Sequence, residues 1–593
     1  MAEGAGGGRR FQAMVAMRDG AGMNTFVFLP EGPGPFPVIL HRTPYGITGA
    51  GAREKFDCDH AWLPSETEPF RGSILRGWRA IAAHGYAAVY QDTRGRHGSE
   101  GEDRVYADDA SDGYDTLEWI AAQVWCNGRI GMSGSSAGAT TTFAAASRRH
   151  PALRAFFAQA GSSSIYDDVV YEGQSIEMER LWLWVARNID GLSASHRGAV
   201  MQRFGLDRTA LDAAAASAAK RYARLEAARH EQPPFVEAAD WLRLPLVRYP
   251  DFATWQPFLD EILSHPAPDA FRAAHDFRRT IDIPGFDVTT WYDIFQTSVI
   301  AAFSDIQARV GNQKLWVGPN DHYFVYESNF WPYDPYFAWF DHWLKGAANG
   351  IMDGPAVSYS PRAWVADRAG YVPNDWRHAE RWPPPLARPR RLYLRGDGGL
   401  GTEPGGAPLT YTYDPRRPVP TLGGRNMLID AGPRDQRPVQ ALSDYGLAYR
   451  GEPLAGDLTI AGAVRVSLAV KSDCPDTDFV AKLIEIEPDG RAMLLMDGVM
   501  RAMYRDGTSE PRPLAPGVAC RMTIALGNIH HTLRAGSRIA VDITSSNFPR
   551  RARNTNSGHA MLAQDGEGDI RVARNTVLHD RATPSYVDLP VLQ

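Results

Sequence analysis

Short, mostly apolar runs alternate with amphipathic segments over the first third of the chain. The runs lie at residues 26–29, 37–40, 86–90 and 129–132. Gly, Pro or polar residues bound them, which is typical of buried strands. Helical spacing is present at 112–124, and a run of small residues at 137–148 is compatible with a second helix. Strand, turn, helix and strand in succession predict an α/β unit built on a parallel sheet.

The pattern changes twice further along the chain. Ala-, Arg-, Glu- and Trp-rich segments predict helices between residues 165 and 275, and strand-like runs resume at 284–288 and 314–317. Beyond residue 385, alternating segments separated by turns predict an all-β sandwich or jelly roll. We therefore expect a first α/β part at 1–164, an inserted helical cap at 165–275, a second α/β part at 276–384 and a β domain at 385–593.

Composition excludes several classes of protein. Of the 593 residues, 44% are hydrophobic and 22% are charged, which is close to the globular average and excludes wholesale disorder. The 56 Gly and 42 Pro residues favour many turns. The 63 basic and 69 acidic residues give a net charge of −6 with no long run of one sign. We therefore expect no nucleic-acid or anionic-lipid partner.

The N-terminal segment and the cysteines bear on location. Only four cysteines occur and none forms a C-x-x-C pair, so we expect a reducing compartment. The first residues, MAEGAGGGRRFQAMVAM, lack the apolar core of a signal peptide. No stretch approaches the ~18 apolar residues of a membrane helix. These features predict a cytoplasmic protein, and exposed sandwich edges are compatible with a homodimer.

The segment Gly134–Gly138 reads GSSAG and fits the pattern G-x-S-x-G. A nucleophilic serine on a sharp strand-to-helix turn needs small neighbours, so that its hydroxyl stands clear of the sheet. The next backbone N–H then faces the developing oxyanion. An ordinary Gly/Ser turn is the alternative, but the strand before and the helix after favour Ser136 as a nucleophile.

An acid and a base follow Ser136 in the order that an α/β-hydrolase uses. Asp293 lies directly after one predicted strand, and His322 follows the next. Catalytic groups gather at the carboxyl ends of parallel strands, and the order Ser, Asp, His is typical of this fold. A helix-capping aspartate and a loop histidine are the alternatives.

Longer phrases resemble the cocaine esterase-like branch of serine hydrolases, which is related to X-prolyl dipeptidyl aminopeptidases and α-amino acid ester hydrolases. The phrases are RTPYG, QDTRGRHGSEG, TTWYDIF, VGPNDH, FDHWLKG and PDTDFVAKL. The resemblance implies an α/β-hydrolase fold with an inserted helical cap and a C-terminal jelly roll. It also implies a small-molecule ester or amide substrate. We expect no cofactor and no metal.

Carried over position by position, the resemblance makes Ser136 the nucleophile, Asp293 the orienting acid and His322 the general base. Tyr45, in an R-x-P-Y phrase, would donate to the oxyanion beside the Ala137 backbone N–H. Both donors are neutral and would stabilise charge that forms only in the tetrahedral state.

Six further residues are candidates for the substrate pocket. By resemblance Phe295 would line the acyl pocket, and Trp182 or Trp184 would do likewise unless either only packs the cap. The acids Asp167, Asp168 and Glu172 correspond roughly to a carboxylate cluster that holds a substrate ammonium group, although an acid-rich helix N-terminus explains them equally well. Relatives carry an aromatic residue after the serine, where this chain has Ala137. Substrate preference therefore does not carry over.

The sequence predicts a serine hydrolase that cleaves carboxylic esters, or amides, through an acyl-enzyme. Two alternatives remain within the class: an X-prolyl dipeptidyl peptidase and an α-amino acid ester or β-lactam acylase. A catalytically silent protein that binds carbohydrate through its β domain is an alternative from another class.

Overall fold

A mostly parallel sheet organises the first two thirds of the chain. The computed structural model describes residues 9–47, 77–228, 241–249, 252–326, 331–366, 375–427 and 429–592. Within these ranges the sheet has ten strands in the order β1-β2-β4-β3-β5-β6-β9-β10-β11-β12, and neighbours from β4 to β11 run parallel. The strands are β1 (Arg10–Ala16), β2 (Gly22–Phe28), β3 (Phe36–Thr43), β4 (Ala87–Asp92), β5 (Cys126–Ser135), β6 (Leu153–Gln159), β9 (Gly285–Tyr292), β10 (Gln313–Asp321), β11 (Val357–Tyr359) and β12 (Arg377–Ala379).

Helices cover both faces of this sheet, which explains why its strands read as near-continuous apolar runs. The helices are α1 (Trp78–Ala83), α2 (Asp109–Ala121), α3 (Ala137–Ala146), α9 (Gln296–Arg309) and α10 (Tyr336–Phe340). Val38 and Leu40 of β3 belong to the core under α2, α3 and α9, whereas Ile39 faces the core under α1 and α10. Burying each such side chain contributes roughly 1.5–3 kcal/mol. The predicted strands and helices are confirmed, with β10 continuing four residues beyond the predicted end, to Asp321.

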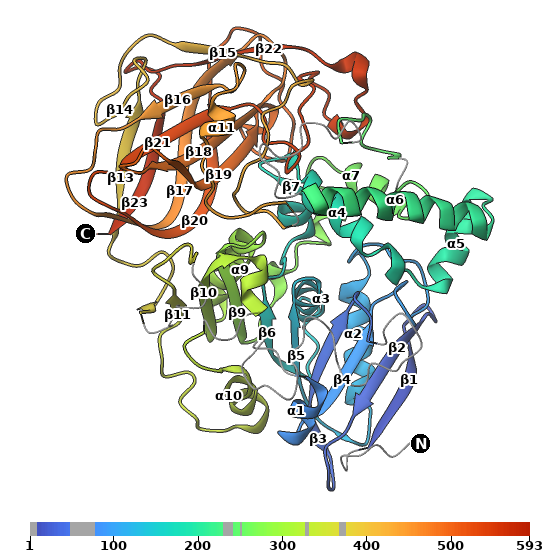
Figure 1. The fold of residues 1–593 in the computed structure, drawn as a ribbon. Helices are drawn as coiled ribbons and strands as arrows, with labels where there is room; N and C mark the ends of the chain where they lie inside the picture. The colour runs from blue at the N-terminus through green and yellow to red at the C-terminus, as the bar shows by residue number, and fades with distance from the viewer. Residues whose placement is uncertain are drawn as a thin grey trace.

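The chain leaves the sheet after β6 and returns at β9, and the segment between forms the cap. In Figure 1, α4 and α6 lie above the parallel sheet and beside the C-terminal strands. The cap elements are η1 (Ile165–Val170), β7 (Tyr171–Glu172), β8 (Ser175–Ile176), α4 (Met178–Arg187), η2 (Ile189–Gly191), α5 (Ala194–Phe204), α6 (Arg208–Ala228), α7 (Phe258–Leu263), α8 (Ala270–Ala273) and η3 (Arg278–Thr280). The expectation of helices alone was wrong at the short antiparallel hairpin of β7 and β8.

Two packed sheets form the C-terminal domain, which is drawn in yellow to red in Figure 1. One contains β13 (Ala387–Leu394), β14 (Leu400–Gly401), β15 (Leu409–Tyr413), β17 (Leu458–Ser472), β20 (Cys520–Leu533), β22 (Ala573–Val577) and β23 (Tyr586–Leu592). The other contains β16 (Leu447–Arg450), β18 (Asp478–Ile486), β19 (Ala492–Arg501) and β21 (Arg538–Thr544), and α11 (Arg437–Gln440) precedes it. The fold class, an α/β-hydrolase with a C-terminal all-β domain, is confirmed. The boundaries at 164, 275 and 384 remain predictions.

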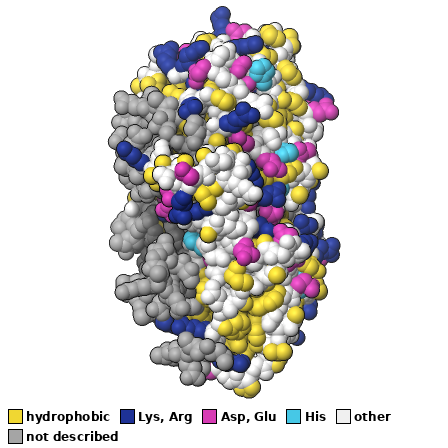
Figure 2. Space-filling view, turned by 90° about the vertical axis from the view of Figure 1, so that its right-hand side faces the viewer, with side chains coloured by type: hydrophobic (Ala, Val, Ile, Leu, Met, Phe, Trp, Pro, Cys, Tyr) yellow, Lys and Arg dark blue, Asp and Glu magenta, His cyan; other side chains and the backbone are white. Residues whose placement is uncertain are grey.

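Charged side chains of both signs are interspersed over the face that Figure 2 shows. This agrees with the nearly balanced charge of the whole chain. No helix in the described part of the chain combines the length and the apolar character needed to cross a bilayer.

Candidate active site

Ser136 lies at the sharp turn that joins β5 to α3. Its backbone has φ +52° and ψ −120°, a conformation that non-glycine residues rarely adopt and that costs about 1–3 kcal/mol. A Cβ added at Gly134 would lie 2.1 Å from the Gly138 carbonyl oxygen, so the turn requires glycine there. The Ser136 N–H donates to the Gln159 carbonyl of β6 at 2.8 Å, which ties the turn to the sheet. The sequence therefore holds Ser136 at the carboxyl end of β5.

Two hydrogen bonds connect Ser136 to a buried carboxylate through His322. The Nε2 atom of His322 lies 3.1 Å from Ser136 Oγ, and its Nδ1 atom lies 2.7 Å from Asp293 Oδ1. Asp293 is fully buried. Its Oδ2 accepts from the Thr289 hydroxyl at 2.7 Å, and its Oδ1 also accepts from the Phe295 backbone N–H at 3.2 Å. With Asp293 as the acceptor, Nδ1 of the ring carries a proton and Nε2 can accept the proton of the serine.

The neighbouring serines of the turn have other surroundings. The hydroxyl of Ser133 lies 3.0 Å from His41 Nε2 and 2.8 Å from the Tyr336 hydroxyl, on the buried side of the strand. The buried Ser135 hydroxyl has no hydrogen-bond partner among the described residues. The geometry therefore singles out Ser136 within the GSSAG segment.

Tyr45 and Ala137 lie at the same edge of the sheet as Ser136. Tyr45 follows β3, which is a parallel neighbour of β5. The two segments also touch, because the Thr141 hydroxyl of α3 donates to the Arg42 carbonyl of β3 at 3.0 Å. Ala137 is the first residue of α3, where backbone N–H groups have no partner within the helix. The phenol oxygen of Tyr45 accepts from Trp184 Nε1 at 3.2 Å.

The aromatic candidates separate into two groups. The Phe295 ring lies beside the His322 ring, with centroids 5.8 Å apart, and Trp184 reaches Tyr45. Trp182 packs edge-on against Tyr249 and Phe252 inside the cap, with centroids 5.9 and 6.1 Å away. Phe295 and Trp184 therefore border the candidate site, whereas the contacts of Trp182 are those of a cap core residue.

Glu172 is occupied by arginines of the C-terminal domain. Its carboxylate lies 2.9 Å from Arg425, 2.6 Å from Arg551 and 3.4 Å from Arg550. Burial alone would raise the pKa of Glu172, but the three guanidinium groups outweigh it and hold that pKa well below its usual range. These contacts place Glu172 at the junction between the cap and the β domain, where three arginines already balance its charge. Its expected role in holding a substrate ammonium group stays a prediction.

The other two acids of the predicted cluster also have partners. Asp167 is exposed and pairs with Arg272 at 3.2 Å. Asp168 accepts from the Ser162 hydroxyl at 3.2 Å, and burial raises its pKa to about 7. The three acids therefore have different polar partners: Arg272 for Asp167, Ser162 for Asp168 and the arginines of the C-terminal domain for Glu172.

One group of possible metal ligands occurs among the described residues. His559, Asp565 and Asp569 of the C-terminal domain have ligand atoms within 4.8 Å of one another. Asp565 is already engaged: its Oδ1 lies 2.7 Å from His559 Nδ1, and its Oδ2 accepts from the Ser557 hydroxyl at 2.6 Å. The three residues belong to the β domain, not to the segments that carry Ser136, Asp293 and His322.

A serine on a strained strand-to-helix turn, a histidine and a buried aspartate on one α/β sheet define the class of serine hydrolases. Comparison with known proteins agrees. Residues 19–324 match the X-Pro dipeptidyl-peptidase (S15) family, and residues 349–588 match the X-Pro dipeptidyl-peptidase C-terminal non-catalytic domain. The chain belongs to this family of hydrolytic enzymes.

Similar proteins cover almost the whole chain. A cocaine esterase of Rhodococcus sp. (strain MB1 Bresler) is 31% identical over 98% of this chain and 98% of its own length. A putative serine esterase of Mycobacterium bovis is 25% identical over 99% of this chain and 96% of its own. A solved α-amino acid ester hydrolase aligns with a TM-score of 0.72 and 23% identity, over 100% of this chain and 98% of its own. The last likeness supports the fold alone.

Two features of the site have no signal in the sequence. The Thr289 hydroxyl supports Asp293 from within β9, where threonine is an ordinary strand residue. The Trp184–Tyr45 hydrogen bond joins segments 139 residues apart. Such contacts follow from the tertiary fold and leave no local pattern.

Proposed function

We propose that this protein hydrolyses carboxylic esters of small molecules through an acyl-enzyme on Ser136. The observation that carries the proposal is the continuous hydrogen-bonded relay from Ser136 Oγ through His322 to Asp293, with contacts of 3.1 and 2.7 Å. A nucleophile, a base and an orienting acid within hydrogen-bond reach are the arrangement that acyl transfer requires.

In the first half-reaction the Ser136 oxygen attacks the ester carbonyl while His322 Nε2 takes the hydroxyl proton. Asp293 keeps the imidazole oriented and stabilises the imidazolium ion. The tetrahedral oxyanion accepts hydrogen bonds from the Ala137 N–H and the Tyr45 phenol. His322 then gives its proton to the departing alkoxide, and the ester bond breaks. Water, deprotonated by His322, next attacks the acyl group and releases the acid and Ser136.

The surroundings of the cap acids favour a plain ester over a substrate with a free ammonium group. An ammonium site needs a carboxylate with unused acceptor capacity that faces the substrate. Glu172 is bound by three arginines and Asp167 by Arg272. We therefore place the X-prolyl peptidase and α-amino ester acylase alternatives second.

The test compares hydrolysis of a small panel by wild type, Ser136→Ala and Ser135→Ala. The panel contains p-nitrophenyl acetate and butyrate, a benzoate ester, an α-amino acid ester and Ala-Pro-p-nitroanilide. We expect turnover of the plain esters, loss of at least about 10⁴-fold in Ser136→Ala, and near-wild-type rates in Ser135→Ala. Preference for the anilide or the amino ester would transfer the proposal to the alternatives. Unchanged turnover in Ser136→Ala would refute the mechanism.

Location and assembly are further predictions. We infer a cytoplasmic protein from the small number of cysteines, of which the three in the described part of the chain are free. A homodimer remains the predicted assembly, and light scattering of the purified protein tests it. Cell fractionation with a C-terminal tag tests the location.

A further inference from the structure

Trp184 is in direct contact with a residue that the proposed function uses in catalysis. It projects from α4 of the cap, and its Nε1–H lies 3.2 Å from the phenol oxygen of Tyr45. An indole N–H can only donate, so the phenol oxygen is the acceptor. The phenol proton of Tyr45 therefore serves a partner other than Trp184.

We propose that Trp184 is a positioning residue that directs the phenol proton of Tyr45 toward the oxyanion. The inference rests on the proposed function, because it takes Tyr45 as an oxyanion donor. Donation from Trp184 fixes the rotation of the Tyr45 O–H group and polarises it, which strengthens the hydrogen bond that the phenol then gives. The charge that this bond stabilises exists only in the tetrahedral state, so Trp184 acts on kcat.

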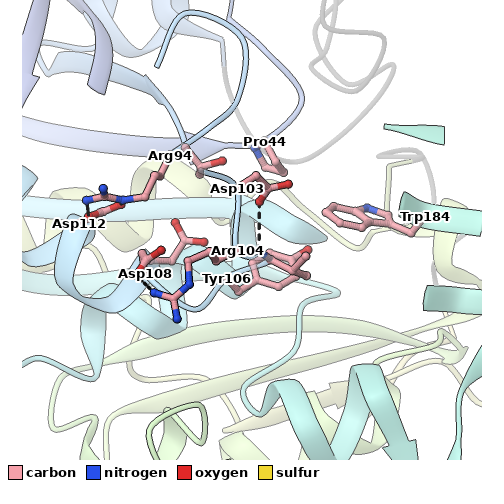
Figure 3. Close-up of a pocket in the computed structure, with 11 residues that line it drawn as sticks. Pro44, Arg94, Asp103, Arg104, Tyr106, Asp108, Asp112 and Trp184 are labelled. Carbon is pink, nitrogen blue, oxygen red and sulfur yellow. Dashed lines mark hydrogen bonds and ion pairs between the residues drawn. The ribbon is translucent and has the colours of Figure 1, made fainter. Parts of the chain in front are cut away.

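The surroundings of Trp184 hold its ring in place. Its ring lies beside the Tyr106 ring, with centroids 5.7 Å apart and planes inclined by 28°. The guanidinium carbon of Arg96 lies 5.6 Å from the Trp184 ring. Arg96 is in turn fixed by a buried ion pair with Asp103 at 2.5 Å and by a hydrogen bond to the Asn188 carbonyl at 2.6 Å. Figure 3 shows Trp184 pointing toward Tyr106 and Pro44.

The segment that carries Tyr106 is strained, which indicates that the fold enforces this contact. Val105 and Tyr106 have φ values of +41° and +66°, a region that side chains with a Cβ avoid at a cost of about 1–3 kcal/mol each. The cavity between this segment, Pro44 and Trp184 measures only ≈ 20 Å³, which is space for little more than one water molecule beside the indole.

Tyr45 is itself anchored on the opposite side. Its backbone N–H donates to the Thr43 hydroxyl at 3.1 Å, and the Ile47 N–H donates to Asp92 at the end of β4 at 2.9 Å. A ring nitrogen of His97 lies 3.1 Å from the Pro44 carbonyl. With both the loop and the indole fixed, the Trp184–Tyr45 bond joins two ordered groups and costs little entropy at the moment of reaction.

A double-mutant cycle tests the proposal. We would measure kcat and KM for p-nitrophenyl butyrate with Tyr45→Phe, Trp184→Phe and the double variant. Trp184→Phe keeps an aromatic ring and removes the N–H. The matched control is Trp255→Phe, because Trp255 is a buried cap tryptophan with an arginine 5.5 Å from its ring but no hydrogen-bond partner for Nε1 among the described residues.

We expect kcat to fall about 100-fold in Tyr45→Phe and about 5- to 10-fold in Trp184→Phe, with KM within about twofold. In the double variant kcat equals that of Tyr45→Phe, because Trp184 acts through the phenol. Trp255→Phe stays within about twofold of wild type. The melting temperature of each variant shows that folding is intact.

Three outcomes overturn the inference in distinguishable ways. If Trp184→Phe lowers kcat equally in the Tyr45→Phe background, Trp184 acts on the pocket and not on the phenol. If KM rises while kcat is unchanged, Trp184 only binds substrate. If Tyr45→Phe has wild-type kcat, the role of Tyr45 in the proposed function fails and this inference fails with it, although Ser136→Ala would still report on the nucleophile.

Discussion

Replacing Glu172 by Gln separates a structural role from substrate binding. Glu172 lies on the β7 strand of the cap and is bound by Arg425, Arg550 and Arg551 of the C-terminal domain. Gln keeps the shape of the side chain and removes its charge, so three buried guanidinium groups lose a counter-ion. Removing one partner of a buried ion pair costs about 3–5 kcal/mol. Because the Glu172 side chain is 26% exposed, solvent screening reduces this cost, and we expect about 2–3 kcal/mol.

This cost converts to a measurable change in melting temperature. The entropy of unfolding is about 2.1 cal/mol/K per residue, or ~1.2 kcal/mol/K for 593 residues. The expected fall in Tm at pH 7 is therefore about 2 °C, measured by differential scanning fluorimetry. Glu452→Gln is the control, because the Glu452 side chain is 95% exposed and its ion pair with Arg538 is 3.7 Å long. We expect this control to leave Tm within about 0.5 °C of wild type.

The pH dependence of the same difference has a definite sign. The pKa of Glu172 is lowered in the folded state, so its stabilising charge is fully present above the unfolded pKa of about 4.3. The contribution is lost as the pH falls through the lowered folded pKa. The Tm difference between wild type and Glu172→Gln should thus be constant from pH 6 to 8 and shrink below about pH 4. An unchanged Tm, together with a KM raised only for α-amino acid esters, would refute this reasoning and restore the ammonium site.

Three other predictions concern buried groups and the turn. Asp287 is fully buried, neither of its carboxylate oxygens has a partner among the described residues, and burial raises its pKa well above the usual range. The folded state therefore keeps this proton as the pH rises, whereas the unfolded state loses it, so wild type loses stability above about pH 4. The Tm of Asp287→Asn relative to wild type should thus rise from pH 5 to pH 8. Parallel Tm curves for the two proteins would contradict this. Gly134→Ala should lower kcat/KM more than about 100-fold, because the added Cβ would lie 2.1 Å from the Gly138 carbonyl oxygen. In Gly138→Ala the nearest atom to the added Cβ lies 3.3 Å away, so this control should keep most activity. Equal losses of the two variants in an ester assay would count against the turn geometry. Asp293→Asn should lower kcat about 10⁴-fold, because an amide cannot hold the same tautomer of His322. The circular dichroism spectrum should stay unchanged. A loss below tenfold would exclude Asp293 as the orienting acid.

The sequence predicts those parts of the site that have local causes. Ser136 is recognisable because its turn requires small residues on both sides, and the apolar runs before Asp293 and His322 mark strand ends. Since parallel strands end at one edge of the sheet, chain order alone brings the three residues together. The fold class follows from the same alternation of strands and helices.

Contacts between distant segments are not predictable in this way. Glu172 and Arg425 are 253 residues apart, and the two segments carry no shared pattern. Glu172 therefore resembles a free acid in the sequence, although three arginines balance its negative charge in the fold. Likewise, Trp182 and Trp184 are equivalent in the sequence, and only the rotation of α4 directs one into the cap core and the other to Tyr45.

The central claim, that Ser136 is the nucleophile and is activated by His322, is tested most directly by covalent labelling. Wild type, Ser136→Ala and His322→Ala would be treated with a fluorophosphonate, which replaces fluoride with the oxygen of an activated serine. Peptide mass spectrometry would then locate the adduct. The account predicts a single adduct on Ser136 in wild type, none in Ser136→Ala, and labelling at least about 100-fold slower in His322→Ala. An adduct on Ser133 or Ser135, or wild-type labelling of Ser136→Ala, would contradict it.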